Sequence, residues 1–238
     1  MSNKALKNIS IAIVLLVALA FIIKFGGPQI LRQYISVGIG DCKKIPILCV
    51  VPNDEILKPE IDKISTKDFV NYIFPKMSVS APKGFSVVQE MIKKYYYKKN
   101  LKQSADSIIY VLHEEKGYFI ELFSDAKKLG VKDNFEFLRR TFNARPDEIK
   151  NLSDAFFVIM KSIFIPDIGN QKNAVMTQFR LGDKYGYITY NLAKDVNYFS
   201  CDMTTDTDAY FKIYIKDKGA KLTLNDLFAI ITTLAKIN

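Results

Sequence analysis

The chain has 238 residues, of which 49% are hydrophobic and 13% aromatic, so it carries enough apolar surface to bury a core and is not a disordered polypeptide. Its net charge of +9 favours anionic partners such as acidic lipid headgroups, cell-wall polymers or nucleic acid, but selects none of them. Three positive residues, Lys4, Lys7 and Lys24, lie in or beside an N-terminal apolar segment, and no acidic residue precedes Asp41.

The first predicted element is a transmembrane anchor over residues 9–25, after a basic tail at residues 1–8. Residues 9–23 are uncharged and contain one polar residue, Ser10. As a helix this run would span about 22 Å, and a snorkelling Lys24 with Phe25 extends it to the lower limit of membrane-spanning length. The sequence therefore predicts a single-pass membrane protein.

A cleaved signal peptide is the alternative interpretation of the same segment. Lys4 and Lys7 would form its basic region, and Ala18-Leu19-Ala20 is a small-x-small cleavage site. We favour the anchor because the apolar run continues through Phe21-Ile22-Ile23 beyond that site. The N-terminal lysines favour a cytoplasmic N-terminus, although Lys24 and later basic residues weaken this bias.

Residues 26–75 are expected to form a proline-containing stalk or linker with little helix. Five prolines are spread over this stretch, at Pro28, Pro46, Pro52, Pro59 and Pro75. Cys42 and Cys49 lie within it and would form a small disulfide loop if the domain is exported; two reduced thiols are the alternative. Their spacing, with no histidine nearby, does not suit a metal site, and none is predicted.

A soluble α+β domain is predicted over residues 76–238. Its first half alternates as strands at residues 77–81 and 85–88, around the turn Pro82-Lys83-Gly84. Residues 107–113 and 118–123 are apolar runs joined by Glu114-Glu115-Lys116-Gly117, which indicates a β-hairpin.

Two helices are expected next, the first capped by Asp133 and the second beginning at Pro146 and ending at Pro166. The buried positions predicted from the spacing are Phe135, Leu138 and Phe142 in the first helix and Ile149, Leu152, Phe156, Ile159, Met160 and Ile163 in the second.

A meander of four strands at residues 175–181, 185–192, 196–203 and 209–215 then leads to a closing helix over residues 224–237. Thr223 and Asp226 are spaced as its capping box. Cys201, inside the third of these strands, is expected to be a small buried apolar residue.

Strands, then helices, then strands and a final helix predict an α+β domain with an antiparallel sheet covered by helices. With Pro82-Lys83-Gly84-Phe85 near its start and the amphipathic helix at its end, the region from Met77 to Ile237 resembles the PsbP-like fold. This resemblance implies an α/β sandwich of the kind found in exported or membrane-associated proteins. No functional residue is carried over from it.

No template for catalysis or cofactor binding is present. His113 is the sole histidine, and without a nucleophile elbow or a partner cysteine it is expected to lie on the hairpin surface. Asp202, Asp206 and Asp208 could offer oxygen atoms to a cation, but they lack the glycine and distal glutamate of a calcium loop, and a polar hairpin loop is favoured. We therefore expect no cofactor, and binding is favoured over catalysis.

The most unusual local pattern is a lysine- and tyrosine-rich stretch whose members could contact phosphates, headgroups, bases or sugars. The alternative is an edge strand whose lysines discourage edge pairing. The candidate binding residues are Lys93, Lys94, Tyr95, Tyr96, Tyr97, Lys98, Lys99 and Lys102.

The sequence as a whole favours a membrane-anchored protein whose domain lies outside the cytoplasm, in the periplasm or at the cell surface, and acts as a non-catalytic binding or accessory protein. Its partners would be the membrane, through residues 9–25, and a protein, an anionic polymer or an anionic lipid, without specific nucleic-acid recognition. Two alternatives remain, a hydrolase with a site dispersed in sequence and a protein that binds anionic lipid or nucleic acid through residues 93–102.

Overall fold

The computed structural model describes residues 27–60, 64–74, 76–91, 94–99, 107–165 and 168–236, with the backbone alone at 87–91 and 94–99. The predicted anchor therefore lies outside the described residues. Among the helices that are described, none has the length and apolar character needed to cross a membrane.

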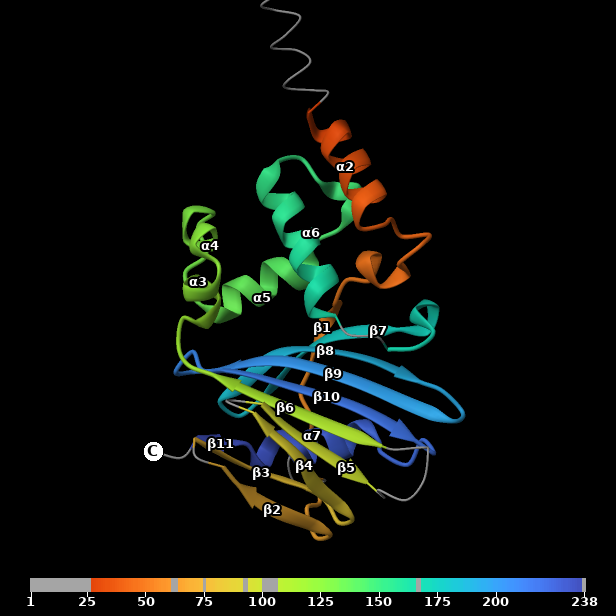
Figure 1. Cartoon of the computed structure of the whole chain (residues 1–238), viewed down its shortest axis with the longest axis vertical. Helices are drawn as coiled ribbons and strands as arrows, with labels where there is room; N and C mark the ends of the chain where they lie inside the picture. The colour runs from red at the N-terminus through yellow and green to blue at the C-terminus, as the bar shows by residue number, and fades with distance from the viewer. Residues whose placement is uncertain are drawn as a thin grey trace, which may run out of the picture.

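The described part of the chain is α+β, with two sheets and six α-helices (Figure 1). The large sheet has the strand order β1–β7–β8–β9–β10–β6–β5–β4. Its strands are Asn53–Leu57 (β1), Phe85–Met91 (β4), Lys94–Lys99 (β5), Ile108–Glu114 (β6), Val175–Leu181 (β7), Lys184–Leu192 (β8), Val196–Thr205 (β9) and Tyr210–Lys218 (β10). All neighbours are antiparallel except β1 and β7, which are parallel, so the sheet is mixed.

The small sheet has the order β11–β3–β2 and lies on the opposite side of the large sheet from most of the helices (Figure 1). Its strands are Phe69–Ile73 (β2), Met77–Pro82 (β3) and Ala235–Lys236 (β11). The α-helices are Gly27–Gly38 (α2), Tyr118–Leu122 (α3), Ser124–Lys128 (α4), Asn134–Asn143 (α5), Leu152–Phe164 (α6) and Leu224–Thr233 (α7). Short 3-10 helices are Pro46–Cys49 (η2), Pro146–Glu148 (η4) and Gln171–Asn173 (η5).

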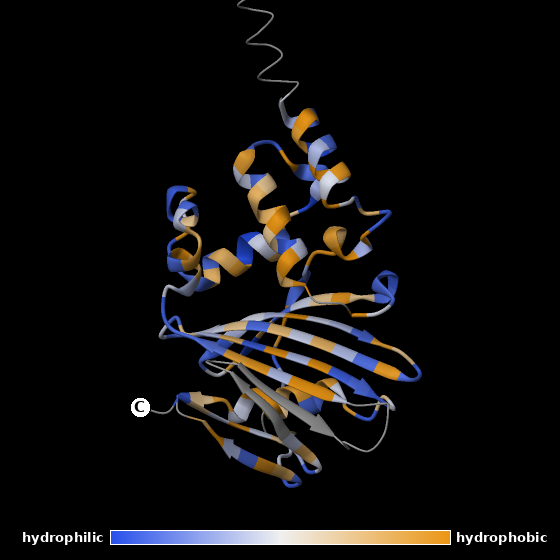
Figure 2. Ribbon diagram, viewed as in Figure 1, coloured by the Kyte–Doolittle hydropathy of each residue, from blue (hydrophilic) through white to orange (hydrophobic). Residues whose placement is uncertain are grey.

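An apolar core forms on each face of the large sheet because the side chains of a strand alternate between its two faces (Figure 2). On one face of the large sheet, Ile188, Phe199 and Ile213 pack with Phe228 and Ile231 of α7 and with the small sheet. On the other face, the sheet residues Met176, Tyr187 and Tyr210 pack against the helices that carry Phe119, Phe137, Phe142 and Phe157. The second core sets the positions of α5 and α6 on the sheet.

Most predicted strands are confirmed with small shifts at their ends, but the predicted hairpin after β6 is wrong. Residues 118–122 form α3 rather than a second strand. The helix expected from Pro146 begins only at Leu152, after the turn η4. Leu152 and Ile163, expected to be buried, are 74% and 63% exposed.

Residues 27–57 contain regular structure, contrary to the expectation of little helix. The helix α2 has 12 residues, and β1 extends the large sheet. Ile47 and Leu48 of η2 are buried, and Ile47 belongs to the core beneath the helices. This part of the predicted stalk therefore packs on the fold.

Candidate functional site

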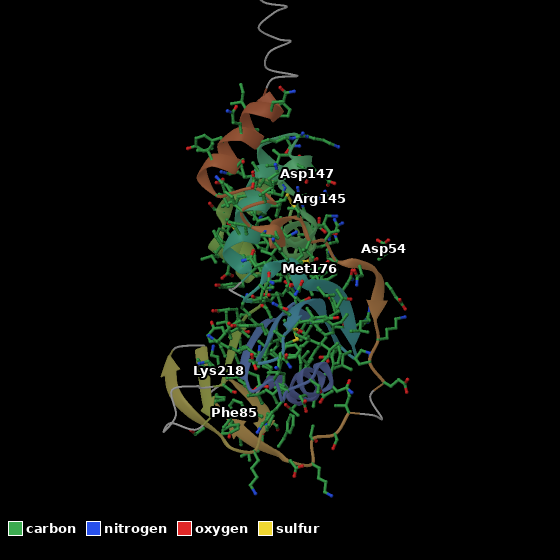
Figure 3. All side chains as sticks on the ribbon, turned by 90° about the vertical axis from the view of Figure 1, so that its right-hand side faces the viewer. Asp54, Phe85, Arg145, Asp147, Met176 and Lys218 are labelled. Carbon is green, nitrogen blue, oxygen red and sulfur yellow. A yellow bond between two sulfur atoms is a disulfide. The ribbon has the colours of Figure 1, made fainter. Side chains whose placement is uncertain are left out.

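A basic pocket lies where α5 ends and α6 begins. Its volume is about 410 Å³, and ten residues line it: Arg139, Arg140, Asn143, Ala144, Arg145, Glu148, Lys150, Asn151, Asp154 and Phe157. All of them come from one continuous stretch of the chain, so the local path of residues 139–157 builds the pocket. Figure 3 places Arg145 among the helices, far from Phe85.

Side-chain caps fix the two helices that form the pocket. Asp133 accepts a hydrogen bond from the Glu136 backbone N–H at the start of α5, as predicted, and Asn151 accepts one from Asp154 at the start of α6. Arg139 and Arg140 lie near the C-terminal end of α5, where the helix dipole favours cations. The N-terminal end of α6 adds partial positive charge to the same pocket.

Arg140 is held rigidly in the pocket wall by neutral groups. Its Nη1 donates to the Leu129 carbonyl at 2.5 Å and its Nη2 to Ser153 Oγ at 2.8 Å. The guanidinium carbon lies 4.3 Å from the ring centroid of Phe157, a cation–π contact. No carboxylate of the described residues forms an ion pair with Arg140, although its charge contributes to the lowered pKa of Glu136.

The other two arginines are already paired with carboxylates. Arg139 makes two hydrogen bonds to Glu136, at 2.8 and 2.9 Å, and this contact holds the pKa of Glu136 below its usual value. Arg145 makes the same kind of contact with Asp147, at 2.6 and 3.1 Å, and lowers the pKa of that carboxyl. Its Nη1 also lies 3.5 Å from the carboxylate of Glu148, which lines the pocket. These pairs orient the arginines but leave little net charge.

Lys150 is the second cation of the lining that forms no ion pair with the described residues. Its side chain is exposed and lines the pocket. Asp154 is occupied by the Lys150 backbone N–H, at 2.8 Å. The lining also contains the carboxylates of Glu148 and Asp154, so its charge is mixed. Arg140 and Lys150 are the two cations of the lining that form no ion pair with the described residues, and they are the groups that an anionic ligand would contact.

A fully buried lysine lies directly behind the pocket. Lys161 Nζ donates to the carbonyls of Val50, Phe142 and Ala144, at 2.7 to 2.9 Å. Burial, with a smaller contribution from Arg145, lowers the pKa of Lys161 to about 7. The lysine ties η2 and the end of α5 to α6, so it supports the pocket from the inside.

The lysine- and tyrosine-rich stretch forms β5, with Tyr96 opposite Tyr110 and Lys98 opposite Ile108 of β6. β5 pairs on both sides, with β4 and with β6, so it is not an edge strand. Lys93, Lys102 and the side chains of residues 94–99 lie outside the described part, so binding through them stays a prediction.

His113 is buried within β6, not exposed on a hairpin as expected. Its side chain is 2% exposed, and its ring lies 4.7 Å from that of Phe211. His113 is absent from the linings of the basic pocket and of three further cavities that described residues form. These four cavities therefore give no support to a catalytic site built on this histidine.

The three aspartates that follow Cys201 do not converge on a cation site. Asp202 is buried and paired with Lys212 Nζ at 2.9 Å. Asp206 is exposed beside Arg180, whereas Asp208 accepts the backbone N–H groups of Asn134 and Gly117. Burial raises the pKa of Asp208 even though these hydrogen bonds oppose the shift.

Cys42 and Cys49 are joined as a disulfide, with Cα atoms 5.5 Å apart, beside Asp147. Bonded sulfur atoms do not supply the thiolates that a metal requires. Cys201 is a buried thiol whose pKa is raised by burial, as expected of a small core residue.

The pocket was missed at the level of sequence, although the sequence carries a signal for it. Arg139, Arg140, Arg145 and Lys150 place four cations within one short stretch. Asp147, Glu148 and Asp154 lie in the same stretch, and the sequence does not show which of the four cations lack carboxylate partners.

Comparison with known proteins does not show a family for the chain. No protein-family model matches the sequence, and no curated protein matches it. A crystal structure from Bacteroides thetaiotaomicron is similar over 71% of this chain and 48% of its own, with a TM-score of 0.36 and 10% sequence identity. The chain thus spans about half the length of that solved protein, and the likeness is too weak to transfer fold or function.

Proposed function

We propose that the protein is a single-pass, membrane-anchored binding or accessory protein whose domain lies outside the cytoplasm and holds an anionic group of its ligand in the basic pocket. The observation that carries the binding proposal is the environment of Arg140. Its guanidinium is fixed by two hydrogen bonds and a ring contact, and it has no carboxylate partner among the described residues.

A preorganised guanidinium favours binding because it loses little conformational entropy when a ligand arrives. Arg140 uses two of its five N–H donors in the contacts to Leu129 and Ser153. Further donors remain for a carboxylate or phosphate oxygen. Lys150 would add a second, exposed positive charge to the pocket.

The membrane part of the proposal rests on the sequence of residues 9–25, which is apolar and bracketed by lysines. The α+β architecture is compatible with the finer proposal of a PsbP-like sandwich, a fold found in exported and membrane-associated proteins. Neither proposal depends on the identity of the anion.

The binding proposal is tested by isothermal titration calorimetry at low salt, in which the detergent-solubilised full-length chain is titrated with inorganic phosphate and, separately, with citrate. Lys150→Gln removes an exposed charge without a described structural contact, and Arg140→Gln removes the fixed guanidinium. Both variants should weaken binding, Arg140→Gln by about tenfold or more because hydrogen bonds to charged groups contribute about 1.5–3 kcal/mol.

Arg180→Gln is the matched control, because Arg180 is exposed and lies outside the pocket. It should bind as the unmodified chain does. Thermal unfolding of each variant separates loss of binding from loss of fold. Equal affinity in the unmodified chain, Arg140→Gln and Lys150→Gln would contradict the proposed site.

A further inference from the structure

The helix α2 presents an apolar stripe to the outside of the molecule. Ile30, Tyr34 and Val37 are 62%, 78% and 78% exposed. Their spacing places them on one face of the helix, because residues separated by three or four positions are neighbours on a helical surface. Three large apolar side chains in a row are an unusual surface for a helix in contact with water alone.

The apolar side of α2 next to this stripe is already packed on the protein. Ile35 is buried and Leu31 half-buried against Ile149, Ala155 and Val158. The polar residues Gln29, Arg32, Gln33 and Ser36 form the remaining part of the helix surface, and Arg32 Nε donates to the Ile149 carbonyl. The apolar surface is therefore a broad arc, of which the protein covers only one half.

The place of α2 in the chain indicates what covers the other half. The helix begins at Gly27, one residue after Gly26 and two after the end of the apolar segment at residues 9–25. It lies at the end of the molecule opposite the small sheet (Figure 1), and hydrophobic residues recur along its length (Figure 2). If residues 9–25 span a bilayer, α2 starts at the surface of that bilayer.

We propose that α2 lies in the membrane interface with Ile30, Tyr34 and Val37 turned towards the acyl chains. The helix carries no acidic residue, and Arg32 is its single charged side chain. Tyrosine is a favoured residue at this depth because its ring is apolar and its hydroxyl is polar. Interfacial helices insert their apolar face to a depth of about 5–10 Å. This inference rests on the proposed anchor, but it adds a second contact that fixes the orientation of the domain on the membrane.

The test uses the absence of tryptophan from the chain. Tyr34→Trp places a single fluorescent reporter in the stripe, and Leu192→Trp places one at an exposed position of β8, away from α2. Each full-length variant is reconstituted into phosphatidylcholine vesicles with plain or brominated acyl chains. We expect bromine to quench the stripe reporter at least about twofold more strongly than the β8 reporter, with a blue shift of the emission from the stripe.

Quenching of the two reporters to the same small extent in reconstituted protein would overturn the interfacial contact and leave the anchor intact. Failure of the chain to associate with the vesicles would overturn the anchor and this inference together. Blue-shifted emission from the stripe reporter without bromine quenching would show that protein covers the stripe, which also overturns the inference. Crosslinking of Ile30→Cys between chains would then assign the stripe to a second copy, and its absence to residues 9–25 of the same chain.

Discussion

Lys161 is the clearest case of a single side chain that makes stability depend on pH. In the folded protein the side chain of Lys161 loses its proton near pH 7, because burial lowers its pKa to about 7. In the unfolded chain the same side chain keeps the proton up to its ordinary pKa of 10.5. Between these values the unfolded state binds more protons. The free energy of unfolding should therefore rise with pH, by at most about 1.4 kcal/mol per pH unit.

Urea denaturation at a series of pH values between 7 and 9 measures this slope. Lys161→Met should remove the rise that Lys161 contributes, because the variant has no proton to bind at this position. Lys172→Met, at an exposed lysine of η5, is the matched control and should retain it. Parallel profiles for the unmodified chain and Lys161→Met would contradict the assignment.

The buried ion pair of Asp202 and Lys212 is a second case in which single side chains determine stability. Asp202 is 1% exposed and accepts a hydrogen bond from Tyr210 at 2.6 Å, in addition to the ion pair with Lys212. Lys212 also donates to the carbonyl of Phe164 at 2.7 Å, which links the sheet to the end of α6. Burial and the Asp202 charge raise the pKa of Tyr210 well above its usual value, so the hydroxyl stays protonated and donates.

Lys212→Met should cost about 3 kcal/mol in urea unfolding, because it leaves a buried carboxylate without its partner. Adding Asp202→Asn to Lys212→Met removes that unpaired charge and should recover part of the loss. If the double variant is less stable than Lys212→Met by the full cost of Asp202→Asn alone, the two residues are not coupled.

Among the elements, two helix caps were predicted correctly, whereas the Asn151 cap of α6 was missed. Asp133 and the Thr223–Asp226 capping box both act as the sequence predicted. A cap is a local interaction between a side chain and the nearest backbone N–H groups, so its signal is contained within four residues of sequence.

Thr223→Ala should destabilise the protein by about 1 kcal/mol, because the Thr223 hydroxyl accepts the Asp226 backbone N–H at the start of α7. Thr232→Ala is the control in the same helix, since its hydroxyl bonds only to the Ala229 carbonyl one turn earlier. Urea unfolding compares the two. A loss no greater for Thr223→Ala than for Thr232→Ala would show that the cap contributes little.

The helix α3 was mistaken for a strand because its sequence is aromatic and β-branched, which favours extended structure locally. Contacts with residues that are distant in the sequence stabilise the helix instead. Phe119 is fully buried, with its ring 4.2 Å from Phe137 and 4.7 Å from Tyr210. The Phe119 backbone N–H donates to Asn134 Oδ1, and Gly117 has a φ of 73° at the turn into the helix. None of these partners can be identified from residues 118–122 alone.

In α6 the buried face was predicted only in part, because residue type does not match burial at three positions. The predicted stripe ran through Leu152 and Ile163, which are exposed, whereas the polar Lys161 is buried. A lysine satisfies a buried position here because three backbone carbonyls converge on its ammonium. That convergence depends on η2 and α5 and is absent from the local pattern of α6.

At the scale of the whole molecule, the alternation of residues predicted the antiparallel meander β7 to β10 well, because its neighbours are adjacent in sequence. The alternation did not predict that residues 27–57 form helices and a strand that pack on the domain. β1 pairs with β7 across more than a hundred residues and in parallel, a contact that no local pattern encodes. The pocket was missed for a related reason, since only the folded chain shows that Arg140 and Lys150 lack the carboxylates that neutralise Arg139 and Arg145.

The proposed anchor and the disulfide of Cys42 and Cys49 both favour a domain that lies outside the cytoplasm, because disulfides persist in oxidising compartments. The most direct measurement fuses alkaline phosphatase, which needs its own disulfides, or a fluorescent protein that matures in the cytoplasm, after residue 238 in a bacterial host. We predict high phosphatase activity, no fluorescence and recovery of the fusion in the membrane fraction. A fluorescent fusion without phosphatase activity, or one that is released freely into the cytosol, would contradict a domain anchored outside the cytoplasm.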